Sequence, residues 1–227
     1  MLLGGLQRSS LIDYPGKVCA IAFTIGCNFR CPYCHNPELV NETAKKISEK
    51  EFFTFLESRV GLLDAVTVTG GEPTQHDDLV NFISQVKKLG FLVKLDSNGT
   101  RPEVLKHLID SSLVDYVAMD IKSPLDKYSI TVGRLVDFEK IQESIALLLE
   151  NKVPYEFRTT VLKDMLAIDD FHEIGKMIEG AKVYYLQKFV PTKLLNPKFE
   201  NKIVYSEEEF EDLRSMMEQY VEACHTR

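Results

Sequence analysis

The sequence has 227 residues, of which 44% are hydrophobic and 27% are charged, and its formal net charge is −7. This length and composition predict an ordinary globular protein that can bury a sizeable core. The acidic balance argues against a nucleic-acid partner, because no basic surface would concentrate phosphates. A small molecule or another protein is the expected partner.

The chain carries no recognisable targeting or membrane segment. Its first residues, "MLLGGLQRSSLIDYPGK", lack an apolar run behind a basic start, and no stretch approaches the roughly eighteen apolar residues that span a bilayer. Of five cysteines, three are clustered, and Cys19 and Cys224 lie far from them and from each other. This pattern favours metal binding in a reducing compartment over a disulfide framework. We expect a cytoplasmic protein without membrane contact.

Six apolar runs have the length and composition of buried strands. They span residues 18–24, 65–69, 91–96, 115–120, 155–161 and 183–190. No low-complexity linker or internal repeat separates them. We therefore predict a single domain over 1–227, with an N-terminal segment 1–17, a core 18–190 and a C-terminal helix 206–224.

Helical patterns with start and stop signals lie between the strands. Ser48 with Glu51 and Ser206 with Glu209 have the spacing of a capping box, and Gly90 is placed to end a helix. Cys19 falls on a strand face and Cys224 on the apolar stripe of the last helix, so both are predicted to be packing residues. Four histidines lie in polar stretches and are expected at the surface without partners: His76, His107, His172 and His225.

Strands that alternate with helices predict parallel pairing, because each crossover returns the chain to the same edge of the sheet. Six such units fall short of the eight that close a full barrel. We therefore predict an α/β fold, a partial (β/α)6 barrel with a mostly parallel sheet and outer helices. Its chemistry should gather at the carboxyl ends of the strands.

The stretch "GCNFRCPYCHNP", from Gly26 to Pro37, follows the first predicted strand and contains Cys27, Cys31 and Cys34. Soft thiolates select iron-sulfur clusters or zinc. A 4Fe-4S cluster held by three cysteines leaves one iron open to a substrate or cofactor. A zinc site would need His35 as fourth ligand beside Cys34, and an electron-transfer ferredoxin would need a fourth cysteine.

Polar and glycine-rich stretches follow the later strands. "TGGEP" (Thr69 to Pro73) and "DSNGT" (Asp96 to Thr100) both have the composition of tight turns. Asp120 and Lys122 share a strand face, as do Glu156, Arg158 and Thr160. Taken alone, the first pair is typical of an exposed ion pair. Cations on a barrel interior could also hold a carboxylate.

The string "CNFRCPYC", with aromatic Tyr33 before its last cysteine, resembles the cluster loop of the radical S-adenosylmethionine (radical SAM) enzymes. The resemblance implies a partial barrel of that type and one 4Fe-4S cluster held by Cys27, Cys31 and Cys34. It also implies that S-adenosylmethionine binds the open iron through its amino and carboxylate groups. Transfer of one electron to the sulfonium would then release methionine and a 5'-deoxyadenosyl radical. No side chain is expected to be catalytic.

The resemblance also implies where the cofactor binds. Gly70, Gly71, Glu72 and Pro73 resemble the segment that contacts the methionyl amino group. Relatives often carry threonine where this chain has Ser97, and His35 is expected to orient the loop or touch the cofactor without ligating the cluster. The resemblance allows a monovalent cation near Asp96 and Asp120. The remaining implied cofactor-binding residues are Tyr33, Asp96, Ser97, Asn98, Asp120, Lys122 and Arg158.

The longer string "SLIDYPGKVCAIAFTIGCNFRCPYCHNP" resembles the opening of enzymes that activate glycyl radical enzymes. The anaerobic ribonucleoside-triphosphate reductase activating proteins are nearest, and the pyruvate formate-lyase activating enzymes are more distant. The resemblance implies a glycyl radical enzyme as protein substrate and a flavodoxin or ferredoxin as electron donor. No cysteine-rich insert lies between Cys34 and Gly70, which predicts a single cluster.

Two alternatives stay open. A small-molecule radical SAM enzyme, such as a deazapurine synthase, is also compact, but its loop commonly continues with an acidic residue where this chain has His35. A zinc or iron-sulfur binding module without catalysis would need only the cysteine loop. Iron and sulfide content, and cleavage of S-adenosylmethionine by reduced protein, separate these alternatives.

Overall fold

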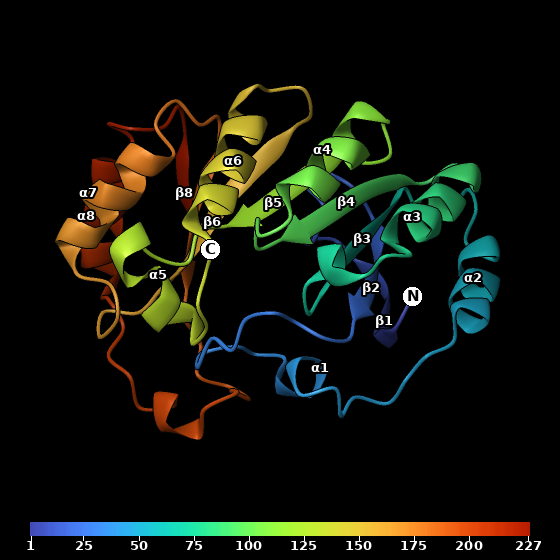
Figure 1. The fold of residues 1–227 in the computed structure, drawn as a ribbon, viewed down its shortest axis with the longest axis horizontal. Coiled ribbons are helices and arrows are strands. Elements are labelled where there is room, and N and C mark those ends of the chain that lie inside the picture. Colours follow the sequence, from blue (N-terminus) through green and yellow to red (C-terminus); the bar gives the residue numbers. More distant parts are fainter. The chain divides into compact units, whose positions relative to one another are not determined.

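The computed structural model describes residues 1–227 and has an α/β fold. Its eight strands follow one another in sequence order, from β1 to β8, so the sheet has two edge strands and does not close (Figure 1). The strands are β1 Leu3–Ser10, β2 Cys19–Thr24, β3 Ala65–Gly70, β4 Leu92–Ser97, β5 Tyr116–Asp120, β6 Tyr155–Val161, β7 Tyr184–Lys188 and β8 Cys224–Thr226.

Helices occupy most of the connections between strands. The six predicted strands all form, with ends within two residues of the expected ones, and the prediction of an open, mostly parallel α/β sheet is confirmed. The α-helices are α1 Pro37–Val40, α2 Glu49–Glu57, α3 Leu79–Lys88, α4 Pro102–Asp110, α5 Leu125–Val132, α6 Phe138–Leu149, α7 Ile168–Met177 and α8 Glu207–Met217, and the short 3-10 helices are η1 Pro73–Gln75 and η2 Pro197–Phe199.

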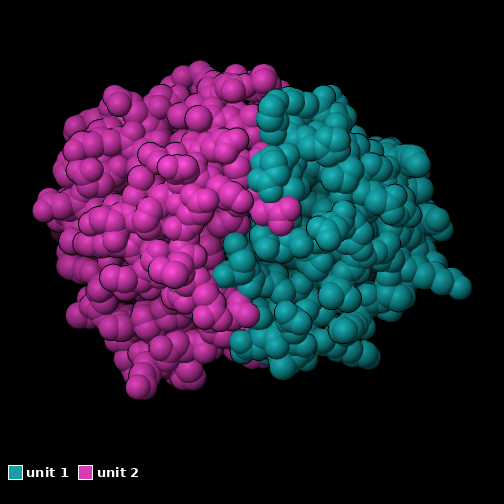
Figure 2. Space-filling view, viewed as in Figure 1, with its two compact units in different colours: residues 1–28, 38–97, 103–117 teal, residues 29–37, 98–102, 118–227 magenta.

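The chain divides into two compact units, which are coloured separately in Figure 2. Strand β5 runs from one unit into the other. The prediction of a single domain stays a prediction, and each unit is described by itself. Unit 1 comprises residues 1–28, 38–97 and 103–117, and unit 2 comprises residues 29–37, 98–102 and 118–227.

Unit 1 is built on β1 to β4. Strand β2 pairs parallel with β3 from Cys19↔Ala65 to Thr24↔Gly70, and β3 pairs parallel with β4. Apolar residues of α2 and α3 cover the core, where the rings of Phe52 and Phe82 lie 5.1 Å apart. Cys19 is fully buried, as expected for a packing residue.

Strand β1 was not predicted. It pairs antiparallel with β2, and this is the reversed pair at one edge of the sheet. Its sequence "LGGLQRSS" contains two glycines and a polar end, so it lacks the alternation and the β-branched residues that indicate a strand. Backbone pairing with the strongly apolar β2 supplies the stabilisation that the local sequence does not.

Unit 2 carries β6, β7 and β8, which pair in parallel. The registers Phe157↔Tyr184 and Tyr184↔Cys224 place three buried side chains in one row. Helix α8 packs against α7 and against β8 (Figure 1). No helix of the chain is both long enough and apolar enough to cross a bilayer.

The predicted C-terminal helix 206–224 is too long. The capping box of Ser206 and Glu209 forms as expected, but α8 ends at Met217, and Cys224 begins β8. Tyr220, Val221 and Cys224 fit a helical stripe, yet the chain turns after Met217. Pairing of β8 then satisfies backbone groups of β7 that would otherwise lack partners. Cys224 is buried, as predicted, but in a strand.

The expectation that His172 has no partner is also wrong. Its Nδ1 lies 2.9 Å from the hydroxyl of Tyr220, which follows α8 in the chain. The two rings meet edge to face, with centroids 6.1 Å apart. This contact joins the end of the α8 segment to α7 and depends on the turn that sequence periodicity did not reveal.

Candidate cofactor site

The glycine pair at the end of β3 allows a close approach of two backbone segments within unit 1. Gly70 has φ +113°, a conformation that side chains rarely permit. A Cβ on Gly71 would lie 1.9 Å from the carbonyl oxygen of Gly26. The same oxygen accepts a 2.8 Å hydrogen bond from the Glu72 N–H. The predicted turn is therefore present, and it fixes the residue directly before Cys27.

Glu72 is a buried carboxylate, 1% exposed. Its Oε1 accepts hydrogen bonds from the Thr74 N–H at 3.1 Å, the Thr74 hydroxyl at 2.6 Å and the Ser97 hydroxyl at 2.9 Å. The bond from Ser97 connects the turn after β3 to the end of β4. Pro73, the residue after Glu72, begins η1. A buried charge persists only with such partners, so Glu72 and Ser97 hold this part of the site in shape.

Asp96, also at the end of β4, forms an ion pair with a lysine side chain. Its Oδ1 lies 2.5 Å from Lys94 Nζ, and its Oδ2 accepts a 3.1 Å bond from the Thr69 hydroxyl. The Lys94 side chain is only 4% exposed. Lys94 was missed by the sequence analysis, although it lies two residues before Asp96 and so shares its strand face.

The three cysteines fall in both units and are described separately. Cys27 belongs to unit 1, whereas Cys31 and Cys34 belong to unit 2. The Cys34 N–H donates to the Cys31 carbonyl at 3.0 Å, which forms a turn between those two residues. Burial raises the pKa of the Cys31 thiol to about 11. Nowhere do three or more Cys, His, Asp or Glu side chains gather as a metal site, so convergence of the three thiols stays a prediction from their spacing.

The part of the cysteine loop in unit 2 is held by distant backbone. The Leu195 N–H donates to the Cys34 carbonyl and the Asn196 N–H to the Pro32 carbonyl, both at 2.9 Å. The Arg30 N–H donates to the Val132 carbonyl at 2.8 Å, at the end of α5. None of these partners carries a sequence signal, because backbone bonding does not depend on side-chain type.

His35 lies at the surface of this loop. Its Nδ1 is 3.2 Å from the Thr192 hydroxyl, and its ring centroid is 5.7 Å from that of Phe189. These contacts are consistent with the expected orienting role. Tyr33 is different, because it is 4% exposed and its hydroxyl has no hydrogen-bond partner. Burial raises the pKa of Tyr33 well above its ordinary value, so this hydroxyl stays neutral.

A cluster of charges follows β5 in unit 2. Asp120 accepts from Arg158 Nε at 2.7 Å and from Lys122 Nζ at 2.9 Å. Burial by itself would raise the pKa of Asp120, but the charges of Arg158 and Lys122 outweigh burial and hold it well below its ordinary value. The ion pair is therefore largely buried and not exposed. Two cationic side chains therefore meet one carboxylate at the end of β5.

Two other predictions can be placed. Asn98 lies in unit 2, where its Oδ1 accepts from the Thr100 N–H at 3.1 Å and from the Thr100 hydroxyl at 2.7 Å, which confirms the turn. The suggested monovalent cation finds both of its carboxylates in contact with cationic side chains, Lys94 on Asp96 and Lys122 on Asp120. The cation itself stays a prediction.

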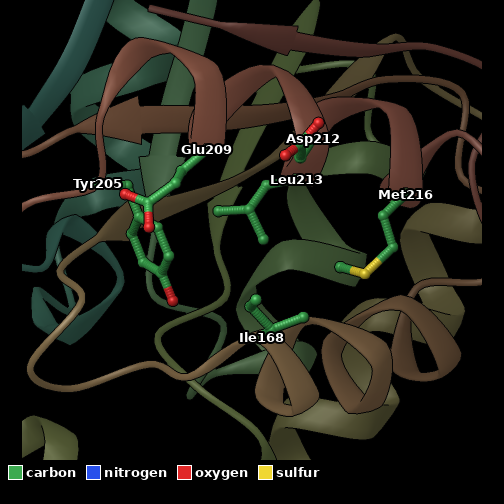
Figure 3. Close-up of a pocket in the computed structure, with 6 residues that line it drawn as sticks. All are labelled: Ile168, Tyr205, Glu209, Asp212, Leu213 and Met216. Carbon is green, nitrogen blue, oxygen red and sulfur yellow. The ribbon is translucent and has the colours of Figure 1, made fainter.

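Unit 2 has a hollow of about 110 Å³ at α7 and α8 (Figure 3), and a neighbouring, more open hollow of about 500 Å³ shares three of its lining residues. None of the predicted site residues lines either hollow. The walls of the smaller one are Ile168, Tyr205, Glu209, Asp212, Leu213 and Met216.

Comparisons with known proteins agree on one class. The Radical SAM superfamily matches residues 21–178. The chain is 34% identical over 226 residues to a Methanocaldococcus jannaschii protein named "putative glycyl-radical enzyme activating enzyme", covering 97% of this chain and 93% of that protein. It is also 30% identical over 160 residues to the pyruvate formate-lyase-activating enzyme of Clostridium pasteurianum, covering 63% of each.

The fold has a solved counterpart. A domain of pyruvate-formate lyase-activating enzyme from Bacteroides vulgatus matches with a TM-score of 0.55 over 72% of this chain and 98% of that chain, at 19% identity. The chain belongs to the radical SAM superfamily and is an enzyme of this type. Membership implies a 4Fe-4S cluster and S-adenosylmethionine. The clustered cysteines, the unpartnered Tyr33 hydroxyl and the cationic side chains of Lys122 and Arg158 fit these groups.

Proposed function

We propose that this chain activates a glycyl radical enzyme, using S-adenosylmethionine to generate the radical on its protein partner. The observation that carries the proposal is similarity along nearly the whole chain to a protein named for that activity, joined to the three-cysteine loop.

In this proposal Cys27, Cys31 and Cys34 hold one 4Fe-4S cluster. When bound, the cluster and S-adenosylmethionine supply one-electron cleavage of a carbon–sulfur bond. The Gly70–Gly71 turn lets backbone come close to the start of the loop. Three thiolates in place of four leave one metal position for the small cofactor.

The charged residues of unit 2 have a separate task. Lys122 and Arg158 offer ammonium and guanidinium donors to the cofactor's carboxylate, while Asp120 keeps both in place. The Tyr33 hydroxyl is available as a neutral donor. None of these side chains needs to exchange a proton during the reaction. Their work is to bind, orient and exclude water, so that one target hydrogen is within reach.

We propose anaerobic ribonucleoside-triphosphate reductase as the partner and a flavodoxin or ferredoxin as the electron donor. Pyruvate formate-lyase is the second candidate partner, and similarity to the Clostridium pasteurianum enzyme favours keeping it. One experiment separates the candidates. Reconstituted, reduced protein is mixed with S-adenosylmethionine and each candidate in turn, without oxygen, and electron paramagnetic resonance is recorded.

The proposal predicts a glycyl doublet with the reductase. A doublet with pyruvate formate-lyase alone would reassign the partner but retain the class of reaction. Cleavage of S-adenosylmethionine with no doublet on either protein would favour a small-molecule enzyme such as a deazapurine synthase. Protein that holds zinc, or that holds a cluster and cleaves nothing, would indicate a binding module.

A further inference from the structure

Tyr33 is a buried side chain with an unused hydrogen-bonding group. It is 4% exposed, and its hydroxyl is one of four buried side-chain groups that have no hydrogen-bond partner. Buried polar groups are nearly always paired, because an unpaired donor has lost its bonds to water without replacement. Phenylalanine would fill the same space without an unpaired donor. The hydroxyl of Tyr33 therefore needs an acceptor that the chain itself does not supply.

A tight turn fixes the backbone of Tyr33 between two of the predicted cluster ligands. The Cys34 N–H donates to the Cys31 carbonyl at 3.0 Å, so Pro32 and Tyr33 are the two central residues of a β-turn. Proline presets the backbone angle that the first central position of such a turn requires. The Asn196 N–H also holds the turn, by donating to the Pro32 carbonyl at 2.9 Å. The region that the Tyr33 side chain can reach is therefore restricted.

The thiol of Cys31 is buried in the same turn, and the residue is 8% exposed. After burial itself, a charge on Cys31 does most to raise the pKa of Tyr33, ahead of the charge of Asp120. The thiol and the hydroxyl are therefore close enough to act on each other. Iron binds cysteine as a thiolate, so ligation places negative charge in this buried region. The neutral hydroxyl then gains an acceptor for its proton.

The other polar side chains near Tyr33 do not take its hydrogen bond. The Lys122 ammonium donates to Asp120 at 2.9 Å and has no lone pair with which to accept. The Tyr128 hydroxyl lies 3.4 Å from both the Lys122 N–H and the Asp120 carbonyl. The acceptor that ligation adds to this turn is sulfur.

We propose that the Tyr33 hydroxyl donates a hydrogen bond to a sulfur atom of the bound cluster, on the side of Cys31, and thereby makes the cluster easier to reduce. The proposal rests on the proposed ligation of a 4Fe-4S cluster by Cys27, Cys31 and Cys34. Reduction adds one electron, and a hydrogen bond strengthens as its acceptor becomes more negative. Hydrogen bonds to sulfur are among the properties that set the reduction potential of iron-sulfur clusters. The electron comes from the donor protein, or from dithionite in the test, and Tyr33 keeps its proton.

The test compares Tyr33→Phe with Tyr205→Phe, which changes a second buried tyrosine of unit 2. The Tyr205 hydroxyl donates to the Leu166 carbonyl at 2.7 Å, so it differs from that of Tyr33 in having a partner. The midpoint potential of the anaerobically assembled cluster is measured by titration with dithionite, without S-adenosylmethionine. We expect Y33F to shift the reduction equilibrium about tenfold toward the oxidised cluster, which is a fall of about 59 mV for one electron. Y205F should leave the potential unchanged.

Two further measurements separate a hydrogen bond from an effect of packing. Electron-nuclear double resonance on the reduced cluster, before and after transfer to deuterium oxide, counts the exchangeable protons that couple to the cluster. We expect one fewer such proton in Y33F than in wild type or in Y205F. Replacement of Tyr33 by 3-fluorotyrosine retains the hydroxyl and makes it a stronger donor, so the potential should rise above that of wild type.

If Y33F and wild type have the same potential and the same exchangeable protons, the proposal is wrong. It is also wrong if Y33F keeps the wild-type potential but binds S-adenosylmethionine more weakly in calorimetry, because the hydroxyl then contacts the cofactor. If Y33F assembles no cluster, the 3-fluorotyrosine variant decides, and a potential equal to that of wild type would overturn the proposal. Wild type that assembles no 4Fe-4S cluster would refute the proposed function together with this inference, whereas the other outcomes leave the proposed function intact.

Discussion

A Cβ placed on Gly71 would come within 1.9 Å of the carbonyl oxygen of Gly26. The obstacle is backbone, which cannot rotate away as a side chain can. The end of β3 is thus fitted directly against the residue before Cys27. Any shift here is transmitted to the first cysteine of the loop, which gives the glycine pair a role beyond that of a turn.

We therefore expect Gly71→Ala to lower the iron content after reconstitution and to destabilise the fold by about 1–3 kcal/mol, as overpacking does. The control is Gly5→Ala in the same unit, where the nearest atom is Phe23 Cδ2 at 3.2 Å, part of a side chain that can adjust. Iron and sulfide analysis and urea unfolding measure both effects. A Gly71 variant that holds iron as wild type does would show that the contact is unimportant.

The contribution of Glu72 to the stability of the fold can be tested without measuring activity. Glu72→Gln removes the charge that receives three hydrogen bonds from Thr74 and Ser97, so we expect a loss of about 1–3 kcal/mol in the free energy of unfolding. Glu57→Gln, at the exposed end of α2, should change it by less than about 0.5 kcal/mol. If urea unfolding showed the same loss of unfolding free energy for both variants, the buried carboxylate of Glu72 would not stabilise the fold.

Lys122 should matter for binding the cofactor. Lys122→Met removes one of the two cations on Asp120, and a charge-assisted bond of about 1.5–3 kcal/mol corresponds to roughly 10- to 150-fold in affinity for S-adenosylmethionine. Lys106→Met breaks an exposed pair with Asp110, for which an effect of about 0–1 kcal/mol on stability and none on binding is expected. Calorimetry on oxidised protein would count against this assignment if both variants bound equally well.

The depressed pKa of Asp120 predicts that the stability of the fold depends on pH. Its pKa is depressed in the fold, so the unfolded chain takes up the proton first as the pH falls below about 3.9. The stabilisation is present above that pH and is lost progressively below it. The difference in unfolding free energy between wild type and Asp120→Asn should be constant from pH 6 to 5 and should shrink toward pH 3. A difference that stays constant to pH 3 would contradict the assignment.

Much of the fold could be predicted because its central strands are apolar runs between helices with capping and stop signals. Strand β1, which lacks alternation, and β8, whose Cys224 fits a helical stripe equally well, could not be predicted. Both are edge strands, and their formation depends on pairing with β2 and β7. Helix α5 was missed as well, because it is short and follows Pro124.

Residue type and chain position were informative for the turn at Gly70–Gly71 and for the Asp120–Lys122 pair, whereas a cluster shared by the three cysteines stays a prediction. The contact of Lys94 with Asp96 could have been found, because the two residues share a strand face. The bonds from Leu195 and Asn196 to the cysteine loop could not, because they depend on where distant backbone passes. Arg227 reaches Glu156 only because the chain forms β8, which helical periodicity had hidden.

The central claim is that this enzyme takes a hydrogen from a glycine of its protein partner. Anaerobic ribonucleoside-triphosphate reductase, produced with glycine deuterated at the α carbon, is incubated with reduced enzyme and S-adenosylmethionine, and the 5'-deoxyadenosine formed is examined by mass spectrometry. The account predicts transfer of deuterium to that product as the reductase gains its radical. Cleavage of S-adenosylmethionine with no deuterium transferred would contradict it.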